Sequence, residues 1–121
     1  MKKTILLVDD FENTRYVTRI TLRRYGYNIL EAADGLEALK FFDGREIDLL
    51  ITDQNMPNMD GITLVERIRN MKNYKYIPIL LLTTEKSVEK KRRAQRAGIT
   101  GWIQKPFSFK NFTKLVEKAL K

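Results

Sequence analysis

Short apolar runs, separated by segments of helical periodicity, restrict the fold of this chain more than any other feature. The runs are Thr4–Val8, Asn28–Glu31, Ile47–Thr52, Ile77–Thr83 and Gly101–Gln104. Three of these five are near-continuous rather than alternating. A strand that is apolar on both faces has to be covered on both faces, which is typical of a parallel sheet between two layers of helices.

The segments between the runs carry apolar side chains at helical spacing. Two later segments have the stripes Leu64, Val65, Ile68 and Met71, and then Phe112, Leu115, Val116, Ala119 and Leu120. Both stripes predict amphipathic helices. A helix is also predicted from about Asn13 to Tyr25, with a half-threonine stripe made of Thr14, Val17, Thr18, Thr21, Leu22 and Tyr25.

Two further segments are predicted to be helices with smaller apolar faces. Asp34-Gly35 opens the first, Asp43-Gly44 closes it, and its inward face is Leu36, Leu39 and Phe42. The second runs from Glu85 to Ala97 and has the apolar anchors Val88, Ala94 and Ala97. Six basic residues crowd the rest of it: Lys86, Lys90, Lys91, Arg92, Arg93 and Arg96. We expect this second helix to bury little area.

Five alternations of strand and helix predict a doubly wound α/β fold. Successive βαβ units with right-handed crossovers give a five-stranded parallel sheet in a (βα)₅ three-layer sandwich. A chain of 121 residues can form one core but is too short for a second folded module. We therefore expect one domain over residues 1–121.

The composition excludes several kinds of protein. The chain has no cysteine and no histidine, so disulfides, thiolate chemistry and the commonest transition-metal ligand are missing. No apolar run approaches the roughly 20 residues of a membrane-spanning helix. The apolar stretch before Asp9-Asp10 is also too short for a signal peptide, so we expect a cytoplasmic protein that does not bind a membrane.

Polar residues follow four of the predicted strands. Asp9-Asp10 follows the first, Asp53 the third, Thr83-Thr84 lies at the end of the fourth, and Lys105-Pro106 follows the fifth. Ligands in open α/β sheets bind at the carboxyl ends of the strands. We therefore expect three carboxylates, a hydroxyl and an ammonium group to face one crevice.

This combination of groups suits phosphoryl transfer at a hard cation. Neighbouring carboxylates raise one another's pKa unless a cation compensates, and oxygen ligands favour Mg²⁺, with Mn²⁺ as an alternative. A carboxylate can attack phosphorus to form an acyl phosphate, while a metal and a lysine stabilise the phosphoryl oxygens. Asp53 is the candidate nucleophile and Lys105 the candidate clamp.

Each of these residues also has a purely structural interpretation. Asp9-Asp10 suits a helix N-terminus, and Asp53 suits a turn. Thr83 alone would be an ordinary hydroxyl at a strand end, and Lys105 alone would be a solvated lysine. Their joint placement at the strand ends favours the functional interpretation.

Together and in this order, the residues resemble the receiver domains of two-component response regulators, and among them the CheY type that carries chemotaxis signals. The resemblance covers the whole chain and rests on Asp9-Asp10-Phe11, the segment from Asp53 to Gly61, Thr83 and Lys105-Pro106-Phe107. It implies a flavodoxin-like fold with strand order 2-1-3-4-5, of which CheY is itself a standard example.

The resemblance implies a role for each landmark residue. Asp53 would be phosphorylated, Thr83 would hydrogen-bond the phosphoryl group, and Lys105 would pair with it. The Lys105-Pro106 bond would be cis. The Mg²⁺ ligands would be Asp10 and Asp53, Asp9 through a bound water, and the backbone carbonyl of Asn55.

The resemblance also implies a switch and a means of setting its lifetime. Phosphorylation would draw Thr83 toward the phosphate, and the aromatic residue of the fifth strand, Trp102, would turn inward. Asn55 and Glu85 would flank the path of the water that hydrolyses the phosphoaspartate. Thr84 is larger than the alanine or glycine common at its position and would narrow this path.

The implied partners are a sensor histidine kinase as phosphoryl donor and a target protein on the fourth helix, fifth strand and fifth helix. The segment from Glu85 to Ala97 has six basic residues against two glutamates, +4 of the chain's formal +8, and it favours an acidic target such as the flagellar motor switch. A phosphatase is a further candidate partner. No nucleic-acid recognition pattern is present in the sequence, and we expect a monomer.

Other functions stay open. The domain could instead be a phosphorelay intermediate, regulate a kinase or phosphatase, or be the receiver fragment of a longer transcriptional regulator. A metal-dependent phosphatase or mutase is a third class, but such enzymes usually carry a second acid two residues after the nucleophile, where this chain has Asn55. We expect a switch that catalyses only its own phosphorylation and dephosphorylation.

Overall fold

The predicted apolar runs form one parallel sheet. Within residues 2–121, which the computed structural model describes, the sheet has five strands in the order β2-β1-β3-β4-β5, and this confirms the expected topology. The strands are β1 (Thr4–Val8), β2 (Asn28–Ala32), β3 (Leu49–Asp53), β4 (Ile79–Thr83) and β5 (Gly101–Gln104).

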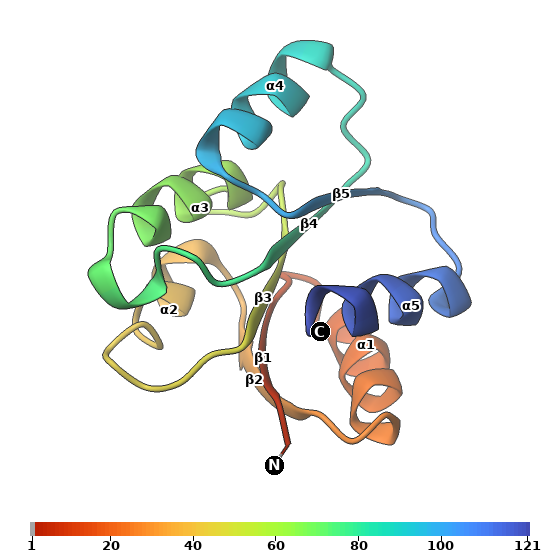
Figure 1. Cartoon of the computed structure of the whole chain (residues 1–121). Coiled ribbons are helices and arrows are strands. Elements are labelled where there is room, and N and C mark those ends of the chain that lie inside the picture. Colours follow the sequence, from red (N-terminus) through yellow and green to blue (C-terminus); the bar gives the residue numbers. More distant parts are fainter. Residues whose placement is uncertain (1) are drawn as a thin grey trace.

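Helices cover both faces of the sheet, as Figure 1 shows: α1 and α5 lie on one face, and α2, α3 and α4 on the other. Their bounds are α1 (Glu12–Arg24), α2 (Gly35–Leu39), α3 (Gly61–Arg69), α4 (Val88–Ala97) and α5 (Phe109–Ala119), with a 3-10 turn at Lys72–Tyr74. The three-layer sandwich is thereby confirmed. Among residues 2–121, no helix is both long and apolar enough to cross a bilayer.

The two helical layers explain why the strands read as continuous apolar runs. In β1, Ile5 and Leu7 point into the cluster that includes Leu22 of α1 and Phe112 of α5. The alternate residues Leu6 and Val8 point into the opposite cluster, with Leu64 and Val65 of α3. Side chains of a strand alternate between faces, so a sheet covered on both sides needs apolar residues at every position.

The shortest helix differs from its prediction at one inward position and at its end. Leu39 and Phe42 pack in the core as predicted, but the helix ends at Leu39 and not at Asp43-Gly44. Leu36 was expected inside, but 48% of it is exposed, whereas Gly35 and Ala38 are buried. The backbone at Gly35 packs so closely on Met59 that a Cβ atom would collide with it. This close approach places the small residues, three apart along the helix, against the neighbouring loop and core.

Two longer helices also bury fewer residues than their predicted stripes contain. Thr18 and Leu22 of α1 are buried, but Thr14, Val17 and Tyr25 are exposed. In α5, Phe112 and Val116 are buried, whereas 41% of Leu115 is exposed. The predicted stripes were wider than the strip that each helix presents to the sheet.

The basic helix α4 starts later than predicted and buries little, as expected. It begins at Val88 because the hydroxyl of Ser87 accepts a hydrogen bond from the backbone N–H of Lys90 at 3.2 Å and caps the first turn. Within Val88–Ala97, Ala94 is the one buried residue, and 65% of the predicted anchor Val88 is exposed. Ala97 is partly buried against the core, and side-chain bonds to α3 add to the attachment.

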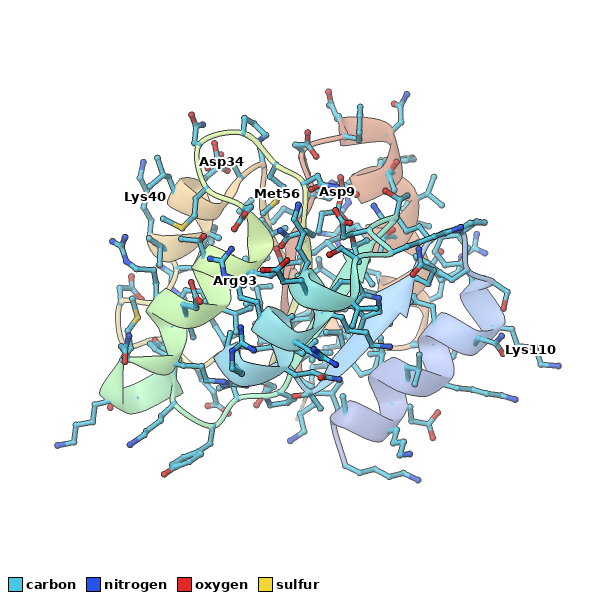
Figure 2. All side chains as sticks on the ribbon, turned by 90° about the horizontal axis from the view of Figure 1, so that it is seen from above. Asp9, Asp34, Lys40, Met56, Arg93 and Lys110 are labelled. Atoms are coloured by element: carbon cyan, nitrogen blue, oxygen red, sulfur yellow. The ribbon has the colours of Figure 1, made fainter. Side chains whose placement is uncertain are left out.

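Two arginines make these bonds between α3 and α4. Arg93 of α4 donates to Glu66 at 2.9 Å and to the hydroxyl of Thr63 at 3.3 Å, and Figure 2 labels it where the two helices meet. Arg69 of α3 donates to the backbone carbonyl of Gly98, which follows the last turn of α4, at 2.7 Å. The helix is therefore fixed along one side and at its C-terminal end.

Candidate functional site

The carboxyl edge of the sheet gathers the residues that the sequence singled out. Asp9 and Asp10 follow β1 directly, and Asp53 is the last residue of β3. One carboxylate oxygen from each lies within 4.8 Å of the other two. Figure 2 looks down on the molecule and labels Asp9 at this edge, near Met56 of the loop after β3. The predicted convergence of three carboxylates is therefore present in the structure.

Asp53 lies at the centre of this cluster and is only 3% exposed. Its Oδ1 atom is 2.8 Å from Nζ of Lys105, which reaches across from the loop after β5. Burial, together with the neighbouring Asp9, raises the pKa of Asp53 to about 7, even though Lys105 acts in the opposite direction. The carboxylate is thus held in a site that disfavours its charge unless more positive charge is supplied.

The two aspartates after β1 have different surroundings. Oδ1 of Asp9 accepts a hydrogen bond from the backbone N–H of Phe11 at 2.9 Å, and the Asp9 N–H donates to the carbonyl of Ala32 on β2 at 3.1 Å. Oδ1 of Asp10 is buried without a hydrogen-bond partner among residues 2–121. A buried carboxylate oxygen without a donor needs a cation or a water.

These residues fit a hard divalent cation. The cluster offers carboxylate oxygens and no nitrogen or sulfur ligand, and Asp10, which has the orphaned oxygen, lines the same cleft as Asp53. Mg²⁺ takes one or two carboxylates and keeps waters for its remaining positions, and such a cation would offset the charge at Asp53. The donor set therefore suits Mg²⁺ by its chemistry.

A cleft of about 200 Å³ lies over Asp53. Its walls are Asp10, Phe11, Asp53, Asn55, Leu82, Thr83, Thr84 and Lys105. The volume is sufficient for a phosphoryl group and a few waters and is smaller than the pockets that hold drug-sized ligands. Of the residues predicted to set the phosphoryl lifetime, Asn55 and Thr84 line this cleft.

Glu85 does not line the cleft. Its carboxylate accepts from the backbone N–H of Ser87 at 3.1 Å and from Nζ of Lys90 at 3.2 Å, so it is directed toward the start of α4. These bonds lower the pKa of Glu85, with Lys90 the larger cause. The backbone N–H of Glu85 instead donates to the hydroxyl of Thr83 at 2.8 Å, which fixes that hydroxyl at the end of β4.

Lys105 follows β5 and lines the cleft, whereas Trp102 lies near the start of β5 and does not line it. The Lys105-Pro106 bond is cis, as the resemblance implied. Trp102 is partly buried against Ile62, Leu81 and Ala94. It also lines a groove of about 360 Å³ along α4, so it contacts both the core and an open surface.

Gln54 is a site residue that the sequence reasoning missed. It is 1% exposed, its side-chain oxygen accepts from the N–H of Ile62 at 2.8 Å, and its NH₂ group donates to Asp60 at 3.3 Å. Its backbone carbonyl also accepts from Gly61 at 2.9 Å. These bonds hold the loop from Asp53 to the start of α3. Gln54 was missed because the sequence around a buried glutamine at a strand end does not differ from that around an exposed one.

Comparison with known proteins identifies the family. Residues 5–117 match the family described as the response regulator receiver domain. The chain is 39% identical over 115 residues to the chemotaxis protein CheY-3 of Vibrio cholerae, an alignment that covers 94% of this chain and 88% of that one.

Solved structures give the same result. The crystallised chemotaxis protein CheY4 of Vibrio cholerae is 40% identical and superposes with a TM-score of 0.93 over 99% of this chain and 100% of that one. The receiver domain of a sensor histidine kinase from Pseudomonas aeruginosa, with magnesium coordinated in its active-site cleft, is 26% identical and covers 99% of this chain and 98% of its own, with a TM-score of 0.89. This chain belongs to the response regulator receiver domain family and is similar in sequence and fold to its CheY-type chemotaxis members.

Proposed function

We propose that this chain is a phosphorylation-dependent switch in which Asp53 accepts a phosphoryl group from a sensor histidine kinase in the presence of Mg²⁺. The observation that carries the proposal is the pairing of Asp53 with Lys105 at 2.8 Å beside two further aspartates, one with an orphaned oxygen. Family members are signalling proteins, and a relative with 26% identity has magnesium in its cleft. The proposal treats residues 1–121 as the whole receiver unit.

The chain's own groups can divide the chemistry among them. An oxygen of Asp53 attacks phosphorus, an oxygen–phosphorus bond forms, and the bond from phosphorus to the donor's leaving group breaks. Lys105 moves from the carboxylate to the new phosphoryl oxygens and stabilises their charge. Mg²⁺, held by Asp10, Asp53 and the carbonyl of Asn55 with Asp9 acting through water, would supply the remaining positive charge.

The switch begins at Thr83 in this proposal. Its hydroxyl oxygen already accepts from the N–H of Glu85, which leaves its own O–H free to donate to a phosphoryl oxygen. Trp102 is the proposed reporter, because it packs beside Ala94 and also faces the groove along α4. A shift at the end of β4 would then alter the surface formed by α4, β5 and α5.

That surface is the proposed binding site for an acidic target, and the flagellar motor switch is the leading candidate because relatives with about 40% identity are chemotaxis proteins. Lys91 and Arg92 line the groove with Trp102 and Val88, so an acidic segment with an apolar side chain would suit it.

A role as a phosphorelay intermediate is the alternative function. A pull-down with the phosphorylated protein separates this role from binding to the motor switch. A phosphatase would be the further partner.

Phosphorylation by a small-molecule donor tests the proposal. Acetyl phosphate with Mg²⁺ should add one phosphoryl group, detected as a mass increase, and EDTA or Asp53→Ala should abolish it. Glu46→Gln, which removes an exposed carboxylate outside the cluster, is the matched control and should label normally. Labelling of Asp53→Ala at the level of the unaltered protein would refute the proposal, and steady hydrolysis of a general phosphoester would revive the phosphatase class.

A further inference from the structure

Arg15 of α1 is bonded to the backbone of the acidic pair from behind the cleft. Its Nη1 atom donates to the carbonyl oxygen of Asp9 at 2.6 Å, and its Nε atom donates to Oε1 of Glu31 on β2 at 3.2 Å. The Arg15 side chain is 18% exposed, so most of it is shielded from water. Hydrogen bonds from a charged donor under such shielding are stronger than those at an open surface.

Glu31 holds Arg15 in this orientation. Its second oxygen, Oε2, accepts from Nη1 of Arg19 at 2.6 Å, so two arginines one turn apart on α1 share one carboxylate of β2. The carboxylate thereby fixes the guanidinium group of Arg15 between β2 and the Asp9 carbonyl. Within residues 2–121, Arg19 donates to Glu31 but not to Asp9, so the two arginines differ in the one contact that reaches the acidic pair.

Both backbone groups of Asp9, its N–H and its carbonyl, are connected to β2 by hydrogen bonds. The Asp9 N–H donates directly to Ala32 of β2, and the Asp9 carbonyl is tied to β2 through Arg15 and Glu31. Phe11, the N-cap residue of α1, makes no side-chain cap bond. The turn that presents Asp9 and Asp10 is therefore held by the bond from the Phe11 N–H to the Asp9 carboxylate and, from the helix, by the Arg15 contact.

We infer that Arg15 is a positioning residue that orients the turn carrying Asp9 and Asp10 for cation binding, through its bond to the Asp9 carbonyl. The inference rests on the proposed function. Groups that orient metal ligands from behind typically change metal affinity by about 10- to 100-fold when they are removed. The lost contact lies on the backbone, so both carboxylates of the pair are affected together.

The sign of the effect separates positioning from simple charge. Arg15 carries a positive charge close to the acidic cluster, and its removal would by electrostatics alone strengthen the binding of a cation. If Arg15 positions the turn, its removal weakens binding instead. The neutral variants Arg15→Ala and Arg15→Gln therefore give opposite results under the two explanations.

The experiment is a titration of the full chain with MgCl₂ at constant ionic strength, followed by the backbone amide NMR signals of the turn. Arg15→Ala and Arg15→Gln should weaken Mg²⁺ binding roughly tenfold or more. Arg19→Ala removes a neighbouring positive charge from the same glutamate but no bond to Asp9, and it should bind Mg²⁺ at least as tightly as the unaltered protein. Each variant's fold is checked from the dispersion of the same spectra.

Two outcomes overturn the inference. One is unchanged or tighter Mg²⁺ binding in Arg15→Gln, and the other is an equal loss of affinity in Arg15→Ala and Arg19→Ala. If the unaltered protein does not bind Mg²⁺ at all, the proposed function itself fails. The two failures are therefore distinguishable within one set of titrations.

Discussion

Nζ of Lys105 lies 2.8 Å from Oδ1 of Asp53, yet the ion pair does not hold the carboxyl group in its charged form at low pH. Burial raises the pKa of Asp53 to about 7 in spite of Lys105, and Asp9 adds to the rise. The desolvation of a buried carboxylate is the larger effect here. The positive charge of Lys105 is therefore not enough to stabilise the charged form of the Asp53 carboxylate.

This shortage predicts an unusual pH dependence of stability without Mg²⁺. The pKa of Asp53 is about 7 in the folded chain, against an ordinary value of 3.8 for an aspartate in an unfolded chain, so between these values the folded state binds more protons than the unfolded state. The contribution of Asp53 to the free energy of unfolding is at its maximum below about pH 4 and is lost as the pH rises through 7. Asp53→Asn should be more stable than the unaltered protein at pH 8 by about 1 to 4 kcal/mol.

Urea unfolding in EDTA at pH 5 and pH 8 measures this difference. The gap between Asp53→Asn and the unaltered protein should be much smaller at pH 5, and Mg²⁺ at pH 8 should reduce it by stabilising the unaltered protein. An equal gap at both pH values would contradict the raised pKa of Asp53.

Lys105→Met should strengthen the binding of Mg²⁺ but slow phosphorylation by acetyl phosphate. Without the ammonium group the pKa of Asp53 should rise above 7, because the group that lowers it is gone. Mg²⁺ binding at pH 8.5 should tighten, since a competing positive charge is absent, whereas labelling by acetyl phosphate should slow at least tenfold. NMR titration and the mass assay measure these changes, and Lys110→Met, an exposed lysine of α5, is the matched control.

Thr84→Ala should phosphorylate faster than the unaltered protein. Thr84 is exposed and forms part of the wall of the cleft, so a smaller side chain widens the access of donor and water to Asp53. The rates of labelling by acetyl phosphate and of subsequent dephosphorylation are the measurements. Thr14→Ala, an exposed threonine on α1 that does not line the cleft, should leave both rates unchanged. Equal rates in Thr84→Ala and the unaltered protein would rule out a steric role.

Two substitutions on α5 should separate the core from the surface of the same helix. Phe112 is fully buried, and Phe112→Ala should lower the free energy of unfolding by about 3 to 5 kcal/mol. Leu115 is 41% exposed, and Leu115→Ala should lower it by about 1 kcal/mol or less. Urea unfolding at one pH compares the two. Similar losses in both variants would contradict the orientation of α5.

The fold was predictable because the apolar runs carry its main constraint. Runs such as Thr4–Val8 are apolar at consecutive positions, which in a short segment indicates a strand buried on both faces. Individual inward positions were less predictable. Leu36 was placed inside on its periodicity, and the close packing of Gly35 on Met59, which decides the matter, is a tertiary contact without a local signal.

The candidate site was predictable where its residues end strands. Asp53 and Thr83 are the last residues of their strands, so the sheet itself brings them to one edge. Gln54 and Arg15 could not be found this way, because both act through hydrogen bonds to backbone groups at other places in the chain. The side-chain direction of Glu85 depends likewise on the exact start of α4, and that start was predicted three residues too early.

The shallow seating of α4 has a consequence for its motion. In α4 Ala94 is buried and Ala97 partly buried, and the rest of the helix is held by polar contacts, so it can open locally at a fraction of the free energy that unfolds the whole molecule. Its amide hydrogens should therefore exchange with solvent through frequent local openings, while those of β3 and β4 exchange through rare global ones. A protein that binds α4 also has to suppress these local openings. Its affinity therefore depends on the conformational entropy that α4 loses on binding as well as on the contacts that form.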